Sequence, residues 1–352
     1  MTDTTAPPSS PWDLDRDALG ELLGGHPSYR VDQVWKGMHE QGLAPSEIST
    51  LPKAMRQEFA DTLAPALTPA ARQETADGMT VKRLWELPGG ARVESVLMHY
   101  PQRSTVCISS QAGCAMACGF CATGQAGFER HLSVGEILEQ VVVARNEAAP
   151  RRLSNIVFMG MGEPFANYDR VMAATRRIID DLGIGQRKIT VSTVGLVPQM
   201  RRFADEGLQV GLAVSLHAAN NELRTELVPI NKRNPIEDIV DASRLYRQNT
   251  GRRVSFEWAM IADTNDRDSD ARELIKVAND ARAHVNLIPL NPTPGWPTVG
   301  TKPERIRQFA SQLEAGGVNV TVRANRGTDI DAACGQLRAN HEATPVKLRR
   351  KP

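Results

Sequence analysis

The sequence contains no apolar run approaching the roughly 20 residues that a membrane-spanning helix requires. Residues 1–11 are polar and rich in Ala, Pro and Ser, without the apolar core of a signal peptide. We therefore expect no membrane partner and a cytoplasmic location. The net charge is only +1, but this does not exclude a nucleic-acid partner, because the distribution of charge matters more than its sum.

The sequence also lacks the cysteine pattern of a disulfide framework. Its five cysteines are odd in number, and three of them fall within eight residues. The five are Cys107, Cys114, Cys118, Cys121 and Cys334. Clustered cysteines in a chain without a secretion signal more often bind metal or take part in chemistry.

Basic residues recur as doublets through the middle of the chain and gather again at its C-terminus. The doublets are Arg151-Arg152, Arg176-Arg177, Arg187-Lys188, Arg201-Arg202, Lys232-Arg233 and Arg252-Arg253, and the tail spans residues 347–351. Any one doublet is readily explained as a solvated helix face. Several doublets along one groove would instead suit the phosphate backbone of a nucleic acid, with the salt-sensitive affinity typical of such contacts.

The chain divides into four segments by composition and pattern. We expect residues 1–12 to be disordered and residues 13–99 to form a small accessory domain of short helices and one β-hairpin. A core domain is expected at 100–333, followed by a C-terminal segment at 334–352 that contains Cys334 and the basic tail. The accessory domain and the basic doublets together suit docking on RNA.

From about residue 100 the pattern alternates between apolar strands and helices. The expected strands are 105–109, 155–159, 188–192, 209–216, 254–261, 284–290 and 318–324. The expected helices are 133–146, 168–180, 198–206, 235–249, 268–281 and 303–314. Near-continuous apolar strands that alternate with helices indicate an α/β fold with a parallel sheet, curled or open.

Polar or glycine-rich segments follow five of the expected strands. These segments are 114–121, 160–164, 192–195, 215–217 and 289–292. Because ligands of such sheets bind at the carboxyl ends of the strands, these segments are expected to meet at one rim. That concentration of polar residues would be unusual for a scaffold and is typical of an active site.

The first of these segments places Cys114, Cys118 and Cys121 in the pattern Cys-x3-Cys-x2-Cys. Structural zinc takes four protein ligands, commonly as two Cys-x2-Cys pairs, and no fourth Cys or His stands at a suitable spacing. A [4Fe–4S] cluster held by three cysteines keeps one iron open for another ligand. The spacing therefore favours an iron–sulfur cluster over structural zinc.

This spacing, with Phe120 before the last cysteine, resembles the signature of the radical S-adenosylmethionine (SAM) superfamily. The wider sequence Gly113-Cys-Ala-Met-Ala-Cys-Gly-Phe-Cys-Ala-Thr-Gly124 resembles the RlmN/Cfr family of radical-SAM methyltransferases, which act on adenine in 23S rRNA. The resemblance extends over about residues 30–337. It includes the segments 93–96, 159–164, 291–295 and 326–337. His131 departs from it, because the family commonly has Asn at this position.

The resemblance implies a partial (βα)6 radical-SAM barrel with a small N-terminal helical and β-hairpin domain. One [4Fe–4S] cluster would be held by the three clustered cysteines, and its open iron would bind SAM. The family's SAM contacts fall on Gly162, Glu163, Ser192, Ser215, Leu216, His217 and Asn291. Each lies at an expected strand end, although any one of them could also be an ordinary turn or cap residue. Glu163, or the backbone beside it, is expected to receive the SAM ammonium group.

The resemblance also implies roles for three residues outside the cluster loop. Cys334 would take a methyl group from one SAM, and a second SAM would supply the radical that removes hydrogen from that methyl group. The methyl carbon would then add to the adenine. Cys107 would release the base by forming a disulfide with Cys334, while Glu94 would accept the ring proton. Without the resemblance, Cys107 is an ordinary buried thiol and Glu94 a charged hairpin residue.

The implied substrates are adenine 2503 of 23S rRNA and adenine 37 of transfer RNA, each methylated at C2 after the base has been unstacked. An external electron donor is also implied, and we expect a monomer. Methylation at C8 of the same rRNA adenine is the nearest alternative, because both reactions use the same cysteines. A radical-SAM enzyme acting on a small molecule or peptide, and a non-catalytic RNA-binding metalloprotein, are more distant alternatives.

Overall fold

The structure, a computed structural model, describes residues 10–291, 299–324, 326–332 and 336–337. Its central feature is a sheet of ten strands in the order β1-β2-β3-β4-β7-β8-β9-β10-β11-β12. The strands are β1 (Thr68–Glu74), β2 (Thr80–Glu86), β3 (Arg92–Tyr100), β4 (Arg103–Cys107), β7 (Leu153–Phe158), β8 (Ile189–Thr193), β9 (Gly211–Ser215), β10 (Ser255–Met260), β11 (His284–Pro289) and β12 (Val320–Val322). Two further strands, β5 (Gln111–Gly113) and β6 (Phe128–His131), form a separate ladder.

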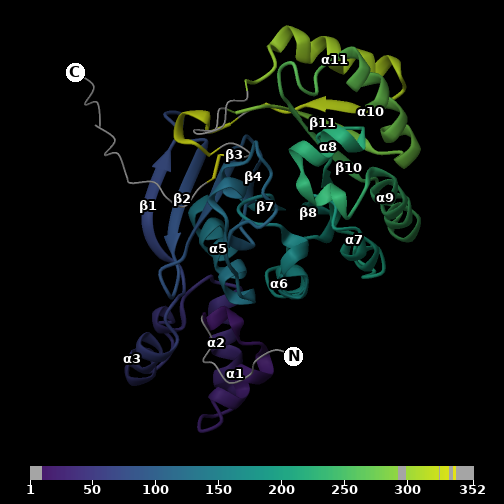
Figure 1. The fold of residues 1–352 in the computed structure, drawn as a ribbon. Coiled ribbons are helices and arrows are strands. Elements are labelled where there is room, and N and C mark those ends of the chain that lie inside the picture. The colour runs from purple at the N-terminus through teal and green to yellow at the C-terminus, as the bar shows by residue number, and fades with distance from the viewer. Residues whose placement is uncertain (1–9, 292–298, 325, 333–335, 338–352) are drawn as a thin grey trace, which may run out of the picture.

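Strands β1 to β4 pair antiparallel, whereas the pairs from β4 onward are parallel. Helices fill the connections between parallel strands and lie around the outside of the curved sheet (Figure 1). These helices are α4 (Ala122–Ala126), α5 (Val134–Ala148), α6 (Tyr168–Asp180), α7 (Val197–Ala204), α8 (Asn221–Leu227), α9 (Ile236–Thr250), α10 (Asp268–Ala281) and α11 (Pro303–Ala315). Three more helices, α1 (Arg16–Leu22), α2 (Tyr29–His39) and α3 (Lys53–Thr62), precede β1. The sheet of the described residues is open, with β1 and β12 at its edges. This confirms the predicted α/β partial barrel.

Local sequence explains where the helices begin and end. Helix α5 starts with a capping box, in which Ser133 Oγ accepts from Glu136 N and Ser133 N donates to Glu136 Oε2 at 3.1 and 2.9 Å. Helix α9 ends at Gly251, whose φ of 69° lies in the left-handed region that favours glycine. The predicted helices 168–180 and 268–281 match α6 and α10 residue for residue.

Several elements were not expected from the sequence, among them β1, α4, α8 and the β5–β6 ladder. The side chains of β1 are exposed or half-buried along its whole length, so they give no apolar alternation. Helix α8 has only seven residues, which is too short for a clear helical period.

Part of the segment expected to be disordered is ordered. Residues 1–9 lie outside the described residues, but Pro11–Asp13 form a short 3₁₀ helix and Trp12 is buried. Asp13 Oδ1 accepts from the backbone N–H of Gly135, in the first turn of α5, at 2.6 Å. The prediction of disorder for residues 10–12 is therefore wrong, because Trp12 packs into the core and Asp13 bonds to α5.

The strands of the predicted accessory domain belong to the same sheet as the predicted core. β3 pairs with β4 over five residue pairs, from Val96 opposite Cys107 to Tyr100 opposite Arg103. The sheet therefore crosses the boundary expected at residue 99, and only α1 to α3 extend away from it (Figure 1). None of the described helices is both long and apolar enough to cross a membrane.

Candidate functional site

A cavity with an empty volume of about 1030 Å³, measured to its open mouth, lies at the carboxyl ends of the parallel strands. Its walls include the clustered cysteines and most of the predicted SAM contacts. The predicted residues that line it are Cys114, Cys118, Cys121, Gly162, Glu163, Ser192, Ser215, His217 and Asn291. Leu216 is not among the lining residues, because its side chain is fully buried in the core. The rim predicted from the strand ends thus encloses one cavity.

The loop that carries the cysteines is held by its own backbone. Cys114 N donates to Gly127 O at 2.6 Å, and Cys121, which precedes α4, donates to Cys118 O at 3.2 Å. Gly113 has a φ of 71°, and a Cβ there would lie 2.0 Å from Gly127 O. Only glycine fits at this crossing, which brings the two ends of the cysteine loop together.

The chemistry of the three thiols fits a cluster. Burial raises the pKa of Cys114 to about 12, and burial also raises the pKa of Cys118 well above its usual range. Buried thiols of this kind stay protonated unless bound metal stabilises the thiolates. Among the described residues, no three His, Cys, Asp or Glu side chains are arranged around a single ion. Three cysteine side chains at one cavity supply three thiolate ligands, the number that holds a [4Fe–4S] cluster with one iron open to another ligand.

Glu163 joins two strand ends at the cavity. Its Oε1 accepts from Phe165 N at 3.0 Å and its Oε2 accepts from Val194 N at 2.9 Å. Burial raises the pKa of Glu163 to about 7, although these hydrogen bonds act in the opposite direction. The carboxyl group thus connects the loops after β7 and β8.

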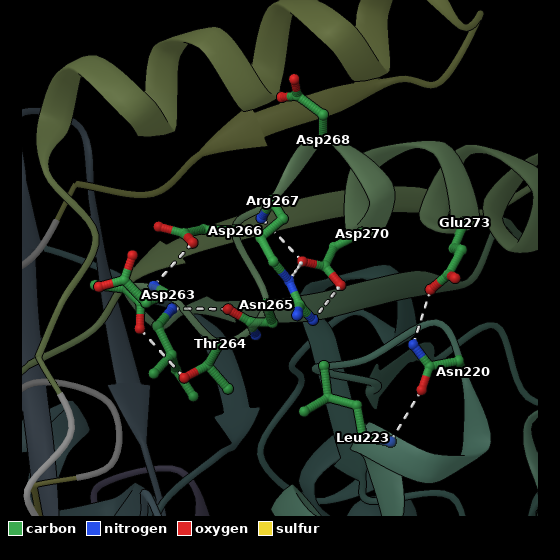
Figure 2. A network of polar contacts seen from close by, with 12 residues as sticks. Asn220, Leu223, Asp263, Thr264, Asn265, Asp266, Arg267, Asp268, Asp270 and Glu273 are labelled. Atoms are coloured by element: carbon green, nitrogen blue, oxygen red, sulfur yellow. Dashed lines mark hydrogen bonds and ion pairs between the residues drawn. The ribbon is translucent and has the colours of Figure 1, made fainter.

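His217 is held as a neutral ring. Its Nδ1 accepts from Ala259 N at 3.0 Å, which leaves the ring proton on Nε2. Burial, followed by the nearby Arg224 charge, lowers the pKa of His217 to about 3. Its backbone has a φ of 59°, and Asn265 Nδ2 donates to its carbonyl oxygen at 2.8 Å. Asn265 lies in the loop after β10, within the polar network shown in Figure 2.

Arg224, which the sequence did not single out, ties the ends of β8 and β9 together. Its guanidinium is buried and donates to three backbone carbonyl oxygens and one side chain. The acceptors are Leu216 O at 3.1 Å, Val194 O at 2.6 Å, Ser215 O at 3.3 Å and Asn231 Oδ1 at 2.8 Å. It thereby fixes the backbone on which Ser215 and His217 stand. In the sequence it is one charged residue in a short helix, a pattern typical of solvent exposure.

Glu257 and Arg323 are two further cavity residues that the sequence reasoning missed. Glu257 Oε1 accepts from Asn286 at 2.8 Å, whereas its Oε2 has no hydrogen-bond partner in the described part of the chain. Arg323 Nη1 lies 3.7 Å from that Oε2. A lone carboxylate within the apolar run 254–261 was the available signal for Glu257.

Glu94 and Cys107 do not line this cavity but share one face of the adjoining strands. Cys107 lies opposite Val96, two residues along β3 from Glu94, so their side chains point to the same side of the sheet. Helix α5 covers the other side, where Trp85 and Val106 line a small gap beneath it. Both Glu94 and Cys107 are buried.

Cys334 lies outside the described residues, but its neighbours on both sides are held in place. Before it, Asp331 O accepts from Lys82 Nζ of β2 at 3.3 Å, and Ala332 is buried. After it, Leu337 O accepts from Thr123 Oγ1 of α4 at 2.6 Å. The described residues that flank Cys334 therefore contact the Glu94 face of the sheet on one side and α4 on the other.

Comparisons with known proteins agree with this geometry. A family model described as the radical SAM superfamily matches residues 108–275. A probable dual-specificity RNA methyltransferase RlmN of Salinispora tropica is 52% identical over 332 residues, which cover 90% of this chain and 88% of the relative. The protein of the same name from Thermobifida fusca is 50% identical to this chain, and the match covers 96% of each of the two proteins.

A solved structure gives the same result in three dimensions. A radical SAM methyltransferase from Sphaerobacter thermophilus matches with a TM-score of 0.91 and 47% identity, over 94% of this chain and all of that one. Radical-SAM enzymes use a [4Fe–4S] cluster together with SAM, in keeping with the three cysteines at the cavity. Identity near one half over almost the whole length establishes common descent, and this chain belongs to the RlmN/Cfr family of radical-SAM methyltransferases.

Proposed function

We propose that the protein methylates C2 of adenine 2503 in 23S rRNA and C2 of adenine 37 in transfer RNA. One observation carries the proposal: the cavity with three cysteines adjoins a sheet face with Glu94 and Cys107, and the residues flanking Cys334 contact both regions. The relatives from Salinispora tropica and Thermobifida fusca are named dual-specificity RNA methyltransferases, which supports two RNA substrates. Substrates of this kind are consistent with a cytoplasmic location.

Different cavity residues would bind the two cofactors. Cys114, Cys118 and Cys121 would hold one [4Fe–4S] cluster, which supplies the electron for reductive cleavage of SAM once an external donor has reduced it. Ser192, Ser215 and Asn291 offer neutral hydrogen-bonding groups for the carboxylate and ribose of SAM. The neutral His217 adds a ring N–H donor to these hydrogen-bonding groups.

Three residues would act on the methyl group and the base. The sulfur of Cys334 takes a methyl group from one SAM by displacement, and a second SAM is consumed when a hydrogen atom is removed from that methyl group. The carbon radical left on Cys334 adds to C2, and the adduct gives up one electron, which the oxidised cluster could take back, and the ring proton, which Glu94 accepts. The sulfur of Cys107 then bonds to that of Cys334 as the carbon–sulfur bond breaks, the released carbon takes up a proton, and an external thiol reductant reduces the resulting disulfide.

We further propose that the segment 13–99 helps to dock the RNA. Several basic doublets are already partnered within the protein, since Arg176 pairs with Glu206 at 2.6 Å and Arg202 with Asp169 at 2.7 Å. Long-range attraction to phosphate therefore depends on the unpaired basic residues, and binding should weaken as salt rises.

The decisive experiment uses anaerobically reconstituted protein, a reductant, unmodified 23S rRNA and SAM with a trideuterated methyl group. Mass spectrometry of the digested RNA should find 2-methyladenine that retains two deuteriums, because one is lost from the methyl group on Cys334. Retention of all three would indicate direct displacement and refute the relay. Chromatographic identity with 8-methyladenine would refute the C2 assignment. The variant Cys107→Ala should accumulate a covalent protein–RNA adduct, and free turnover by it would remove Cys107 from the proposed release step.

A further inference from the structure

Lys82, in β2, is a buried cation whose position the proposed reaction does not yet explain. Its side chain is only 3% exposed, and lysine is almost never so deeply buried unless it is paired. Its Nζ lies 3.4 Å from Glu94 Oε1 and 3.3 Å from Asp331 O. The ammonium group therefore stands between the proposed proton acceptor and the chain that leads to Cys334.

Strand register explains how these groups come together. Lys82 lies opposite Val96 of β3, and Val96 lies opposite Cys107 of β4, so the three side chains share one face of the sheet. Glu94, two residues from Val96, points to the same side and forms a diagonal pair with Lys82. Lys82, Glu94 and Cys107 thus occupy a single patch on the side of the sheet opposite α5.

The segment 326–332 covers this patch. Gly327, with a φ of 66°, packs so closely that a Cβ there would lie 3.0 Å from Thr80 Cγ2. Arg326 Nη1 donates to His99 O at 3.1 Å, and Lys82 donates to Asp331 O. Lys82 accordingly contacts both this segment and the carboxylate beneath it.

The positive charge of Lys82 matters because the carboxylate beside it is buried. A buried carboxylate favours its neutral form unless a cation lies nearby, and a neutral carboxyl group cannot accept a proton as a base. A well-packed apolar residue would fill the same space without the desolvation of an ion pair. The charge itself is therefore the property of Lys82 that needs a functional reason.

We propose that Lys82 is a positioning residue for methyl transfer, which keeps Glu94 ionised and holds the segment 326–332 against the face that carries Glu94 and Cys107. This inference rests on the proposed function, because it takes Glu94 as the proton acceptor and Cys334 as the methyl carrier. Lys82 touches neither the base nor SAM in this account. It acts through Glu94 and through the backbone of Asp331.

The test compares Lys82→Met, Lys82→Arg and Glu94→Gln in the reconstituted enzyme, with Lys276→Met on the exposed face of α10 as the matched control. After one turnover, Lys82→Met should leave at least about ten times more RNA covalently attached than the control does, as Glu94→Gln should. Lys82→Arg keeps a cation and should release most of the RNA. Lys82→Met behaving like the control would overturn the proposal.

A second readout does not depend on turnover. Hydrogen exchange of the amides in 326–332 should become about tenfold faster in Lys82→Met, because the bond to Asp331 O is lost, and should change little in Glu94→Gln. Unchanged exchange in Lys82→Met would contradict the positioning role.

If Lys82→Met alone fails to fold, the double variant Lys82→Met with Glu94→Gln tests the same contact, because it removes both charges of the pair together. The fraction of its adduct that is released should equal that of Glu94→Gln alone, because the lost contact to Asp331 O affects how the adduct forms and not how it is released. A further fall in the released fraction would overturn action through Glu94. The two proposals also fail differently. If Glu94→Gln retained no adduct, both the role of Glu94 as proton acceptor and the role of Lys82 would be refuted. If Glu94→Gln retained adduct but Lys82→Met did not, only the role of Lys82 would fall.

Discussion

Replacing Arg224 by lysine should loosen the strand ends that shape the cavity. The buried guanidinium makes four hydrogen bonds, and three of them go to the backbone at the ends of β8 and β9. Lysine carries its donors on a single nitrogen, so it cannot reach both strand ends as the planar guanidinium does. We expect one or two of the carbonyl groups to lose their partner.

The magnitude follows from the burial of those carbonyl groups. A buried acceptor left unpaired costs about 1–3 kcal/mol, so the free energy of unfolding should fall by roughly 2–5 kcal/mol. With about 2.1 cal/mol/K of unfolding entropy per residue over 352 residues, Tm should fall by roughly 3–7 °C. Because the same carbonyl groups position Ser215 and His217, a loss of about 1.4 kcal/mol there would weaken SAM binding about tenfold.

Calorimetry of the reconstituted protein would measure Tm, and equilibrium dialysis with labelled SAM would measure Kd. The matched control is Arg201→Lys, because Arg201 is exposed on α7. If Arg224→Lys unfolds at the temperature of this control and binds SAM equally well, Arg224 does not support the cavity and the reasoning is refuted.

Three further predictions concern the relay, the loop after β10 and pH. Cys334→Ala should bind the cluster and cleave SAM slowly but transfer no methyl group, and normal transfer measured by mass spectrometry of the RNA would exclude the relay. Asn265→Ala removes the donor to His217 O and Ala259 O, so the free energy of unfolding should fall by about 2–4 kcal/mol. Urea denaturation would measure this fall, and a loss under about 0.5 kcal/mol would contradict the prediction. Burial raises the pKa of Glu139 from 4.5 to about 7, so the folded chain holds this proton more tightly than the unfolded chain. The stability of the wild type should therefore decline as pH rises from about 4.5 to about 7, and Glu139→Gln should decline less; equal slopes in chemical denaturation would count against this reading.

The parallel half of the fold could be predicted because its strands are apolar on both faces. All five residues of β9 are buried or half-buried, and all but one of the six residues of β10 are buried. Their carboxyl ends must meet at one rim, so Ser192, Ser215 and Asn291 could be proposed as neighbours from topology alone. By contrast, β1 is mostly exposed and owes its conformation to pairing with β2.

Arg224 and Lys82 could not be predicted, because partners that are remote in the sequence decide their burial. Lys82 contacts Asp331, which lies 249 residues further along the chain. Arg224 bonds to Val194, 30 residues before it. A single charged residue in a helix or strand is typical of a solvated surface, and no local pattern shows that a distant carbonyl group will cover it.

The antiparallel strands also bear on solubility. The sheet of the described residues has β1 and β12 as its edges; β1 carries Pro69 with a register shift beside it, and β12 has only three residues. Neither edge offers a long, flat template to another chain. A chain that began after β3 would instead present β4 along the residues that now pair with β3, beside apolar parallel strands. Strands β1 to β3 therefore protect the barrel against edge-to-edge aggregation.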